Sequence, residues 1–308
     1  TTMPSGITRA TSGVLNSVTA VTGGIENLYS RYIADAKYFY DHGTVMKNLI
    51  RKYDFPDGHG PTYYQPKFDR MTAIHLEESV PIQNAQRLVS NDTLTITPGE
   101  IGMEVLITEK AQRVVNENLM RAAGKITGNA MALLEEDDYL TLFSGVSRVN
   151  GGTGITLSPG LIQAARARVA ANGTEPAPPP YYAVIHDWQY HYLAQDLAMI
   201  QGGNLSLPSD AGSIPHDILE NYFIEKISGV SLFRDNNIEI NASNYSATGC
   251  LFSQEAFGRV EPYAMKSDKE WDRRARAWSL IVRGEYGFGE YSDYFAVRLV
   301  SDASEPEE

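Results

Sequence analysis

The sequence lacks the residues that disulfides, zinc motifs and membrane spans require. Its 308 residues include a single cysteine, Cys250, so no disulfide can form within the chain. The six histidines form neither a His-Glu-x-x-His motif nor part of a cysteine-rich metal set. No apolar run approaches the ~18 residues of a membrane-spanning helix, and the first six residues lack the layout of a signal peptide. We therefore expect a protein of the cytosol, or of a particle assembled there, with no membrane partner.

Positive charge is also scarce. Lys and Arg number 26 against 38 Asp and Glu, and the resulting net charge of −12 argues against a surface that clamps nucleic acid throughout. The candidate for nucleic-acid contact is the basic cluster Arg273, Arg274 and Arg276, beside Trp271, because aromatic rings can stack on bases. Ion pairs within or between subunits are the alternative role of these arginines. The acidic balance of the chain favours that alternative.

Catalytic motifs are missing as well. The chain has no Gly-x-Ser-x-Gly elbow, and Cys250 lacks the context of known nucleophile signatures. The glycine-rich stretch 150–154 has no Gly-Lys-Ser/Thr and no preceding strand, so it does not predict a nucleotide site. His186, Asp187 and His191 straddle a predicted strand-to-helix turn. We expect capping or packing roles there, with a pair of metal ligands as the alternative.

Residues 135–138 read Glu-Glu-Asp-Asp within a predicted helix. Consecutive helical positions point in different directions, so this run is not an acid/base pair facing one substrate. We predict that these carboxylates are solvated or pair with an arginine of a neighbouring subunit, and a divalent-cation site is the alternative. The sequence thus predicts no catalytic residue, no cofactor and no metal site.

The order of segments is more informative than any motif. Residues 1–30 hold 14 Ser, Thr or Gly and only two charges, Arg9 and Glu26, so they have little apolar surface to offset the entropy of ordering. This composition fits either a disordered tail or an arm that becomes ordered on a neighbouring subunit. In residues 31–50, apolar side chains recur at three-to-four spacing and predict a helix, with Arg51 and Lys52 near its C-terminal end.

Residues 54–107 form a long, turn-rich excursion. Prolines and glycines between positions 56 and 81 break any regular helix. Strict alternation of apolar and polar residues at 93–97 and again around 101–107, with Pro98-Gly99 between them, predicts a hairpin. We expect this hairpin to project from the rest of the subunit.

One long helix is predicted over residues 108–143, with a length on the order of 50 Å. Thr108 is its expected cap, and Glu109 suits the positive end of the helix dipole. The alternative is two shorter helices broken near Gly124 and Gly128. An unbroken helix favours a flat, elongated subunit. The apolar positions expected to form one broad stripe are Val114, Val115, Leu119, Ala122, Ala123, Ile126, Ala130, Leu133 and Leu134.

A compact α/β region and then a β-rich region are predicted after residue 150. Ser158-Pro159 starts a helix, because proline suits the first helical position. Asp187 is expected to cap another helix, which follows a buried strand at 181–186. The acidic end, 302–308, is expected to be solvated. Further predicted elements are a Gly/Ser loop at 202–213, a helix at 214–224 and strands at 230–233, 250–252, 256–265, 278–282 and 294–300.

Two stretches carry a resemblance to a known family. Residues 182–188, Tyr-Ala-Val-Ile-His-Asp-Trp, resemble a strand-to-helix entry of that family. Its closing strands resemble Phe-Ser-Gln-Glu-Ala-Phe-Gly at 252–258, Gly-Glu-Tyr-Gly at 284–287 and Ala-Val-Arg-Leu at 296–299. With the order of segments, these stretches make nearly the whole chain resemble the major capsid protein of tailed bacteriophages, whose fold is named after phage HK-ninety-seven.

The resemblance implies an α+β fold with an N-terminal arm, an extended β-hairpin loop, a long spine helix, and peripheral and axial domains. No scaffolding segment of ~100 residues precedes the arm, which implies a separate scaffold or none. The implied division of the chain is an arm at 1–30, an arm-proximal helix at 31–53, an extended loop at 54–107, a spine helix within the peripheral domain at 108–150, an axial domain at 151–248, and peripheral-domain strands with an acidic tail at 249–308.

The resemblance also implies a function without catalysis. The subunit would self-assemble as hexamers and pentamers into an icosahedral shell around packaged double-stranded DNA, as part of a virion assembled in the host cytoplasm. Implied partners are a portal protein, a scaffolding protein and DNA bound without sequence specificity, and a decoration protein is a further partner to test. The residues expected at contacts between subunits are Lys67, Arg70, Glu77 and Glu78, and those expected to face DNA are Arg273, Arg274 and Arg276.

Two alternatives remain open. The first is an encapsulin-like compartment shell that holds cargo enzymes, since it would use the same fold. The second is a cytosolic enzyme with a site around His186, Asp187 and His191. Some relatives join subunits through a Lys–Asn isopeptide bond, but Lys67 has no identifiable asparagine partner, so we do not predict that bond.

Overall fold

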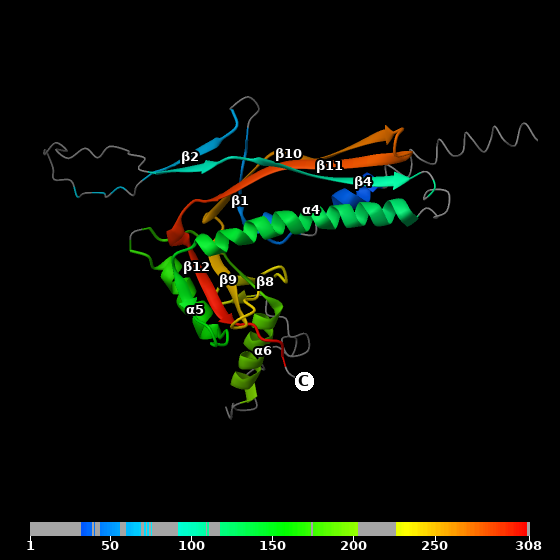
Figure 1. The fold of residues 1–308 in the computed structure, drawn as a ribbon. Helices are drawn as coiled ribbons and strands as arrows, with labels where there is room; N and C mark the ends of the chain where they lie inside the picture. Colours follow the sequence, from blue (N-terminus) through cyan, green and yellow to red (C-terminus); the bar gives the residue numbers. More distant parts are fainter. Residues whose placement is uncertain are drawn as a thin grey trace, which may run out of the picture. The chain divides into compact units, whose positions relative to one another are not determined.

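The computed structural model describes residues 32–38, 40, 44–55, 60–68, 71, 73, 75, 92–108, 110, 118–173, 175–202 and 226–306 (Figure 1). The chain divides into two compact units. Unit 1 comprises Thr1–Thr44, Glu100–Leu134 and Ala264–Gly284, whereas unit 2 comprises Val45–Gly99, Glu135–Tyr263 and Glu285–Glu308. Among the helices of the described residues, none combines the length and the apolarity that crossing a membrane requires.

A four-stranded sheet has the strand order β1-β10-β11-β4. β1 runs parallel to β10, with Arg51 opposite Gly258. A side chain at position 258 would not fit, because a Cβ there would lie 2.4 Å from a ring carbon of Tyr53. The strands of this sheet are β1 (Arg51–Tyr53), β4 (Gly99–Thr108), β10 (Phe257–Asp272) and β11 (Ala277–Glu290).

The core of unit 1 forms where helix α4 (Asn118–Gly145) meets the strands β4 and β11 (Figure 1). The Tyr32 hydroxyl donates a hydrogen bond to Thr127 Oγ1 at 3.3 Å, and the Thr127 hydroxyl donates to the carbonyl oxygen of Ala123 at 2.8 Å. These bonds join the N-terminal helical segment, residues 32–38, to α4. The buried members of this core are Tyr32, Tyr40, Ile107, Met131, Ala132, Leu280 and Val282.

Helix α4 is continuous through Gly124 and Gly128, so the alternative of two shorter helices is wrong. Gly124 instead permits close packing, because a Cβ there would lie 2.7 Å from the carbonyl oxygen of Tyr32. The start that we predict at Thr108 falls among residues outside the described part of the chain, apart from Thr108 itself, which ends β4, and the helical Lys110. The helix ends at Gly145, two residues beyond the predicted end.

Part of the predicted apolar stripe of α4 is not buried, and the side chains of Val114, Val115 and Leu119 lie outside the described part of the chain. Ile126, Leu133 and Leu134 are exposed instead. Small residues on the opposite face let the helix approach its neighbours closely, and close packing outweighs the apolarity of single side chains. The residues that are buried, at three-to-four spacing, are Gly124, Thr127, Gly128, Met131, Ala132, Glu135, Glu136, Tyr139 and Phe143.

Unit 2 contains a six-stranded sheet with the order β5-β12-β9-β6-β8-β7. Helix α5 (Pro159–Ala170) contacts β12 and β9, and helix α6 (Asp187–Gly202) follows β6 (Figure 1). β12 pairs antiparallel with β9, and β6 pairs parallel with β8. The strands are β5 (Val149–Gly151), β6 (Tyr181–Ile185), β7 (Lys226–Ile227), β8 (Val230–Arg234), β9 (Ser246–Ser253) and β12 (Ala296–Asp302), and the short 3-10 helix η1 (Asp293–Phe295) precedes β12.

Local signals predict several elements of unit 2 correctly. Helix α5 begins at Pro159, and the Ser158 side chain accepts a hydrogen bond from the Leu161 N–H at 3.4 Å. β6, β8, β9 and β12 lie where alternation and apolar runs place them. Asp187 is the first residue of α6 rather than its cap. The predicted loop at 202–213 and helix at 214–224 lie outside the described residues, apart from Gly202, which ends α6.

The predicted hairpin of residues 93–107 is wrong in its pairing, although both strands exist. β3 (Asp92–Ile96) pairs antiparallel with β2 (Tyr63–Lys67), and Tyr63 lies opposite Ile96. β4 instead forms an edge of the four-stranded sheet, beside β11. The turn residues at 98–99 therefore separate two strands that belong to different sheets.

The predicted helix of residues 31–50 is also partly wrong. Residues 32–38 and 40 are helical, but the helix does not extend to position 50. A separate turn of helix, α2 (Met46–Leu49), follows, and Arg51 and Lys52 then belong to β1 instead of a helix end. Pairing with β10, a contact remote in sequence, overrides the local helical pattern here.

Candidate functional site

Glu135 and Glu136 of the acidic run of α4 are buried, so the prediction that the run is solvated or pairs with a neighbouring subunit's arginine is wrong for these two. Glu135 is fully buried, and its carboxylate lies 3.4 Å from the Lys47 ammonium while also accepting a hydrogen bond from the Tyr139 hydroxyl at 2.7 Å. Lys47 in turn lies 3.8 Å from Glu261. Asp138 accepts a hydrogen bond from the Tyr286 hydroxyl. Only Asp137 is exposed, as predicted.

Glu136 anchors the start of helix α2. Its two carboxyl oxygens accept hydrogen bonds from the backbone N–H of Met46 at 2.9 and 3.2 Å and from that of Val45 at 3.1 Å. Free N–H groups at a helix start attract negative charge. Burial nevertheless dominates and, with the neighbouring carboxyl of Asp235, raises the pKa of Glu136 to about 9. The group therefore holds a proton at neutral pH.

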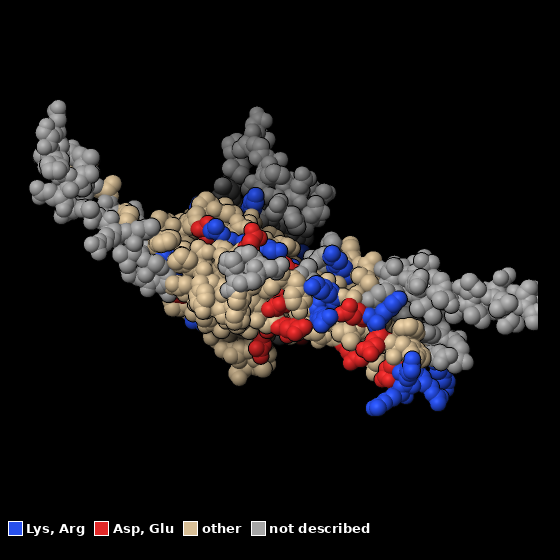
Figure 2. Space-filling view, turned by 90° about the horizontal axis from the view of Figure 1, so that it is seen from above, with Lys and Arg blue, Asp and Glu red and all other residues tan. Residues whose placement is uncertain are grey.

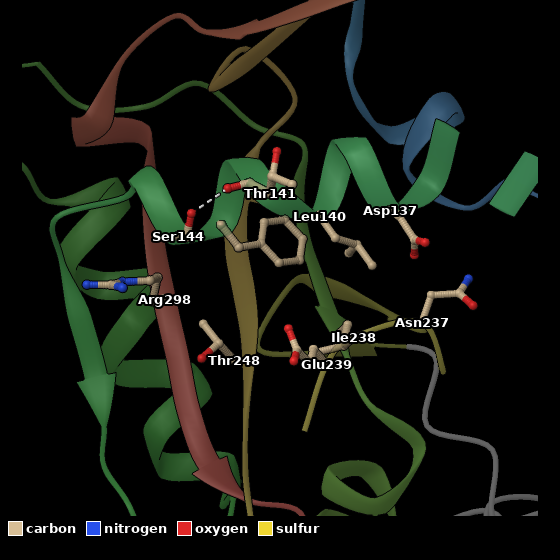
Figure 3. A pocket seen from close by; sticks show the side chains of 10 residues that line it. Asp137, Leu140, Thr141, Ser144, Asn237, Ile238, Glu239, Thr248 and Arg298 are labelled. Atoms are coloured by element: carbon tan, nitrogen blue, oxygen red, sulfur yellow. Dashed lines mark hydrogen bonds between the residues drawn. The ribbon is translucent and has the colours of Figure 1, made fainter. Parts of the chain in front are cut away.

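A hollow of about 640 Å³ lies in unit 2 between the C-terminal part of α4 and the strands beneath it (Figure 3). Asp137 points into it from α4, and Asn237 and Glu239 face it from the loop after β8. The apolar side chains of Leu140 and Ile238 also line the hollow. Within the described residues, however, no three His, Cys, Asp or Glu side chains form a group that could hold a metal ion.

Of the two histidines at the α/β turn, His186 has the predicted capping role. His186 is buried, and its Nδ1 accepts a hydrogen bond from the backbone N–H of Trp188 at 3.1 Å, which caps α6. Burial lowers the pKa of His186, so the ring is neutral and able to accept. His191 Nε2 lies 2.9 Å from Gln195 Nε2 on the same helix. Burial also raises the pKa of Cys250, which makes this thiol a poor nucleophile.

The arginine turn, residues 273–276 between β10 and β11, presents Arg273, Arg274 and Arg276 to solvent. Asp272 Oδ1 accepts hydrogen bonds from the backbone N–H of Arg274 at 2.7 Å and of Ala275 at 3.2 Å. Figure 2 shows a group of Lys and Arg side chains that project together beyond the mixed acidic and basic surface. The sequence predicted this cluster, and the structure shows that it is an ordered turn.

The other predicted contact residues are only partly described. Lys67 ends β2, and its ammonium lies 5.2 Å from the ring centroid of Tyr291. Arg70, Glu77 and Glu78 lie outside the described residues. The predicted contact between subunits at these positions therefore stays a prediction.

An apolar outer face on α4 is the feature that sequence reasoning missed. The exposed fractions of Ile126, Leu133 and Leu134 are 61%, 47% and 45%. Positions 126 and 133 are two helical turns apart, so their side chains share one face. The sequence did contain a signal for this exposed face. Gly124 and Gly128 mark the opposite face of the helix as the one that packs closely.

Comparison with known proteins finds similarity in structure but not in sequence. Neither the protein-family models nor the curated protein sequences include a match to this chain. The capsid of Ralstonia phage GP4 matches with a TM-score of 0.63 and 11% identity, over 84% of this chain and 88% of that chain. The capsid of cyanophage Pam1 matches with a TM-score of 0.62 and 14% identity, over 84% of this chain and 90% of that chain.

This chain has the phage-capsid fold. The predicted α+β architecture and the predicted resemblance are thereby confirmed as statements about fold. A virus-like particle from Pyrococcus furiosus also matches, with a TM-score of 0.55 and 11% identity, over 88% of this chain and 98% of that chain. The same fold thus occurs in two kinds of particle.

Proposed function

We propose that this chain is the structural subunit of an icosahedral shell that encloses packaged double-stranded DNA. The observation that carries the proposal is the match to phage capsids over more than four fifths of both chains. Fold alone does not specify function, but this fold leaves little of the chain unmatched for a second activity. The proposal assigns no catalysis and no cofactor to the subunit.

The exposed apolar face of α4 supports this proposal. A lone soluble subunit would leave Ile126, Leu133 and Leu134 in water, whereas contiguous exposed apolar surface commonly marks an interface. Obligate assemblies bury more than ~2,000 Å² for each interface. In a closed shell, neighbouring subunits would bury this exposed apolar face of α4.

The finer assignments follow from the family resemblance and are part of the proposal. The subunit would form hexamers and pentamers, with a portal protein at one vertex, a separate scaffolding protein during assembly in the host cytoplasm, and a decoration protein as an optional addition. In this scheme residues 1–30 are the arm, 54–107 the extended loop and 151–248 the axial domain. The peripheral domain takes α4 and the strands after residue 248.

An encapsulin-like compartment shell is the second candidate. The observation behind it is the match to a virus-like particle from Pyrococcus furiosus, which covers 98% of that chain. The contents of purified particles distinguish the two candidates. Nuclease-protected DNA of uniform length supports the virion shell, whereas co-purified protein cargo without DNA supports the compartment.

Size-exclusion chromatography followed by negative-stain electron microscopy tests the proposed assembly. We expect closed shells, sheets or hexameric rings from the purified protein at raised concentration or with added scaffold. A dispersed monomer that stays unchanged with concentration, salt and scaffold would contradict the proposal. An enzymatic role around His186 and His191 would then be tested by alanine substitution.

A further inference from the structure

We propose that the arginine turn of one subunit docks on carboxylates of unit 2 in a second copy of this chain. The inference rests on the proposed function, because it requires that copies assemble. It assigns Arg273, Arg274 and Arg276 to a contact between subunits rather than to packaged DNA.

The turn is ordered before any partner binds. The Asp272 carboxylate accepts hydrogen bonds from the backbone N–H groups of Arg274 and Ala275. The rings of Trp271 and Trp278 pack together, and their centroids are 5.1 Å apart. All four turn residues are exposed on this frame. A rigid turn loses little backbone entropy on docking, which favours a specific contact.

The charges of the turn are not satisfied within the described residues. No described carboxylate forms an ion pair with Arg273, Arg274 or Arg276, whereas Arg283 of the same hairpin pairs with Asp268 at 2.7 Å. The nearest acidic residue in sequence is Asp272, and one of its carboxylate oxygens already accepts hydrogen bonds from backbone N–H groups of the turn. Three guanidinium groups therefore remain available for carboxylates from outside the described subunit.

The charges of the two units indicate where those carboxylates lie. Unit 2 contains 28 Asp and Glu against 13 Lys and Arg, a net −15, whereas unit 1 contains 10 against 13, a net +3. An exposed basic turn and a strongly acidic unit on identical subunits are complementary. Such complementarity steers association and sets the register of the contact.

Nucleic acid fits the turn less well. Residues 266–276 carry five Lys or Arg but also three Asp or Glu, a net charge of only +2. Trp271 and Trp278 are half-buried and pack on each other, so they form a poor stacking platform for bases. An arginine can pair with a carboxylate of a protein partner through two hydrogen bonds, and this pairing does not require an extended basic surface.

The test compares two charge-reversal variants of the full chain with equal change in net charge. Arg273→Glu/Arg274→Glu alters the turn, and Lys110→Glu/Lys226→Glu alters two exposed lysines elsewhere. Light scattering over a range of protein concentrations gives the concentration of half-assembly. Circular dichroism and urea unfolding check that both variants fold like the wild type.

We expect the turn variant to raise the half-assembly concentration at least about ten-fold, which corresponds to ~1.4 kcal/mol. The lysine variant should stay within about two-fold of the wild type. A third variant, Arg273→Lys/Arg274→Lys/Arg276→Lys, keeps the charge and should assemble at less than about three-fold higher concentration. Wild-type assembly should weaken more than that of the turn variant between 0.05 and 0.5 M NaCl, because salt screens exposed charges.

Equal assembly by the turn variant and the lysine variant overturns the inference. A turn variant that assembles like the wild type but binds a fluorescent DNA duplex at least ten-fold more weakly also overturns it, in favour of a nucleic-acid surface. Failure of the wild type itself to assemble instead overturns the proposed function. The three results are thus distinguishable in one series of measurements.

Discussion

The two units of this chain differ in what they bury. Unit 2 buries an aromatic cluster around Phe252 together with the ionisable groups Glu135, Glu136 and Lys47. Unit 1 buries a row of small residues on α4 and leaves Ile126 and Leu133 in water. Among the described residues both units also expose large apolar side chains, such as Phe68 in unit 2 and Leu106 in unit 1, so the contrast lies in the kind of core.

The two units also differ in charge. Unit 2 carries a net −15 and unit 1 a net +3. Opposite net charges on two parts of identical subunits favour contact between unit 1 of one copy and unit 2 of another. The comparison teaches that one chain can carry complementary charges on different parts.

The largest loss of stability is expected from Phe252→Ala in unit 2. The Phe252 ring is fully buried, and its centroid lies 5.2 Å from that of Phe257 and 6.2 Å from that of Phe143. We expect the unfolding free energy of unassembled subunits to fall by about 3–5 kcal/mol in urea titrations. Tyr64→Ala removes an exposed ring and should cost less than about 1 kcal/mol. Equal losses in the two variants would refute a core at Phe252.

Gly124→Ala should produce a smaller loss in unit 1. The added Cβ would meet the carbonyl oxygen of Tyr32 at 2.7 Å, so the helical segment 32–38 must shift away from α4. We expect a cost of about 1–3 kcal/mol by urea unfolding, although alanine is the better helix former. The control is Gly173→Ala, since a Cβ at position 173 would have no atom within 4 Å. A stabilised Gly124→Ala variant would show that the close approach is absent.

Glu136→Gln should change how stability depends on pH. The pKa of Glu136 is raised from 4.5 to about 9, so between these values the folded state binds more protons than the unfolded state. The unfolding free energy of the wild type should therefore fall as pH rises across this window, by up to about 1.4 kcal/mol per pH unit.

The measurement for Glu136 is urea unfolding at pH 5, 6, 7 and 8. Glu136→Gln should reduce the fall in stability, because the amide does not titrate. Asp137→Asn, at the exposed neighbouring position, should retain the wild-type pH dependence. If the unfolding free energies of the wild type and of Glu136→Gln depend on pH in the same way, Glu136 is not protonated in the folded state.

The smallest effect on stability, but a large effect on assembly, is expected from Ile126→Glu/Leu133→Glu. Both side chains are exposed, and glutamate is a good helix former. The unfolding free energy should therefore change by less than about 1 kcal/mol. Assembly measured by light scattering should be lost. Ile126→Leu/Leu133→Met keeps the apolar surface and should assemble normally. Normal assembly by the glutamate variant would mean that this face of α4 has no partner.

Local signals in the sequence were enough for elements whose cause is local. Ser158-Pro159 marked the start of α5, because a capping side chain and a fixed backbone act within one turn of helix. Alternation marked β3 and β4 as strands. Their partners could not be predicted, because β3 pairs with β2 and β4 lies beside β11, and strand pairing depends on segments far apart in the chain.

The candidate surfaces divide in the same way. The sequence by itself determined the basic cluster at 273–276 and the acidic excess of the chain, because these depend only on which residues are present. Only the tertiary structure decided that Glu136 is buried, that Leu133 is exposed, and that Asp272 orders the arginine turn. The physical reason is that burial depends on which face of an element its neighbours cover. Packing of distant segments sets that choice, and the apolarity of single residues does not.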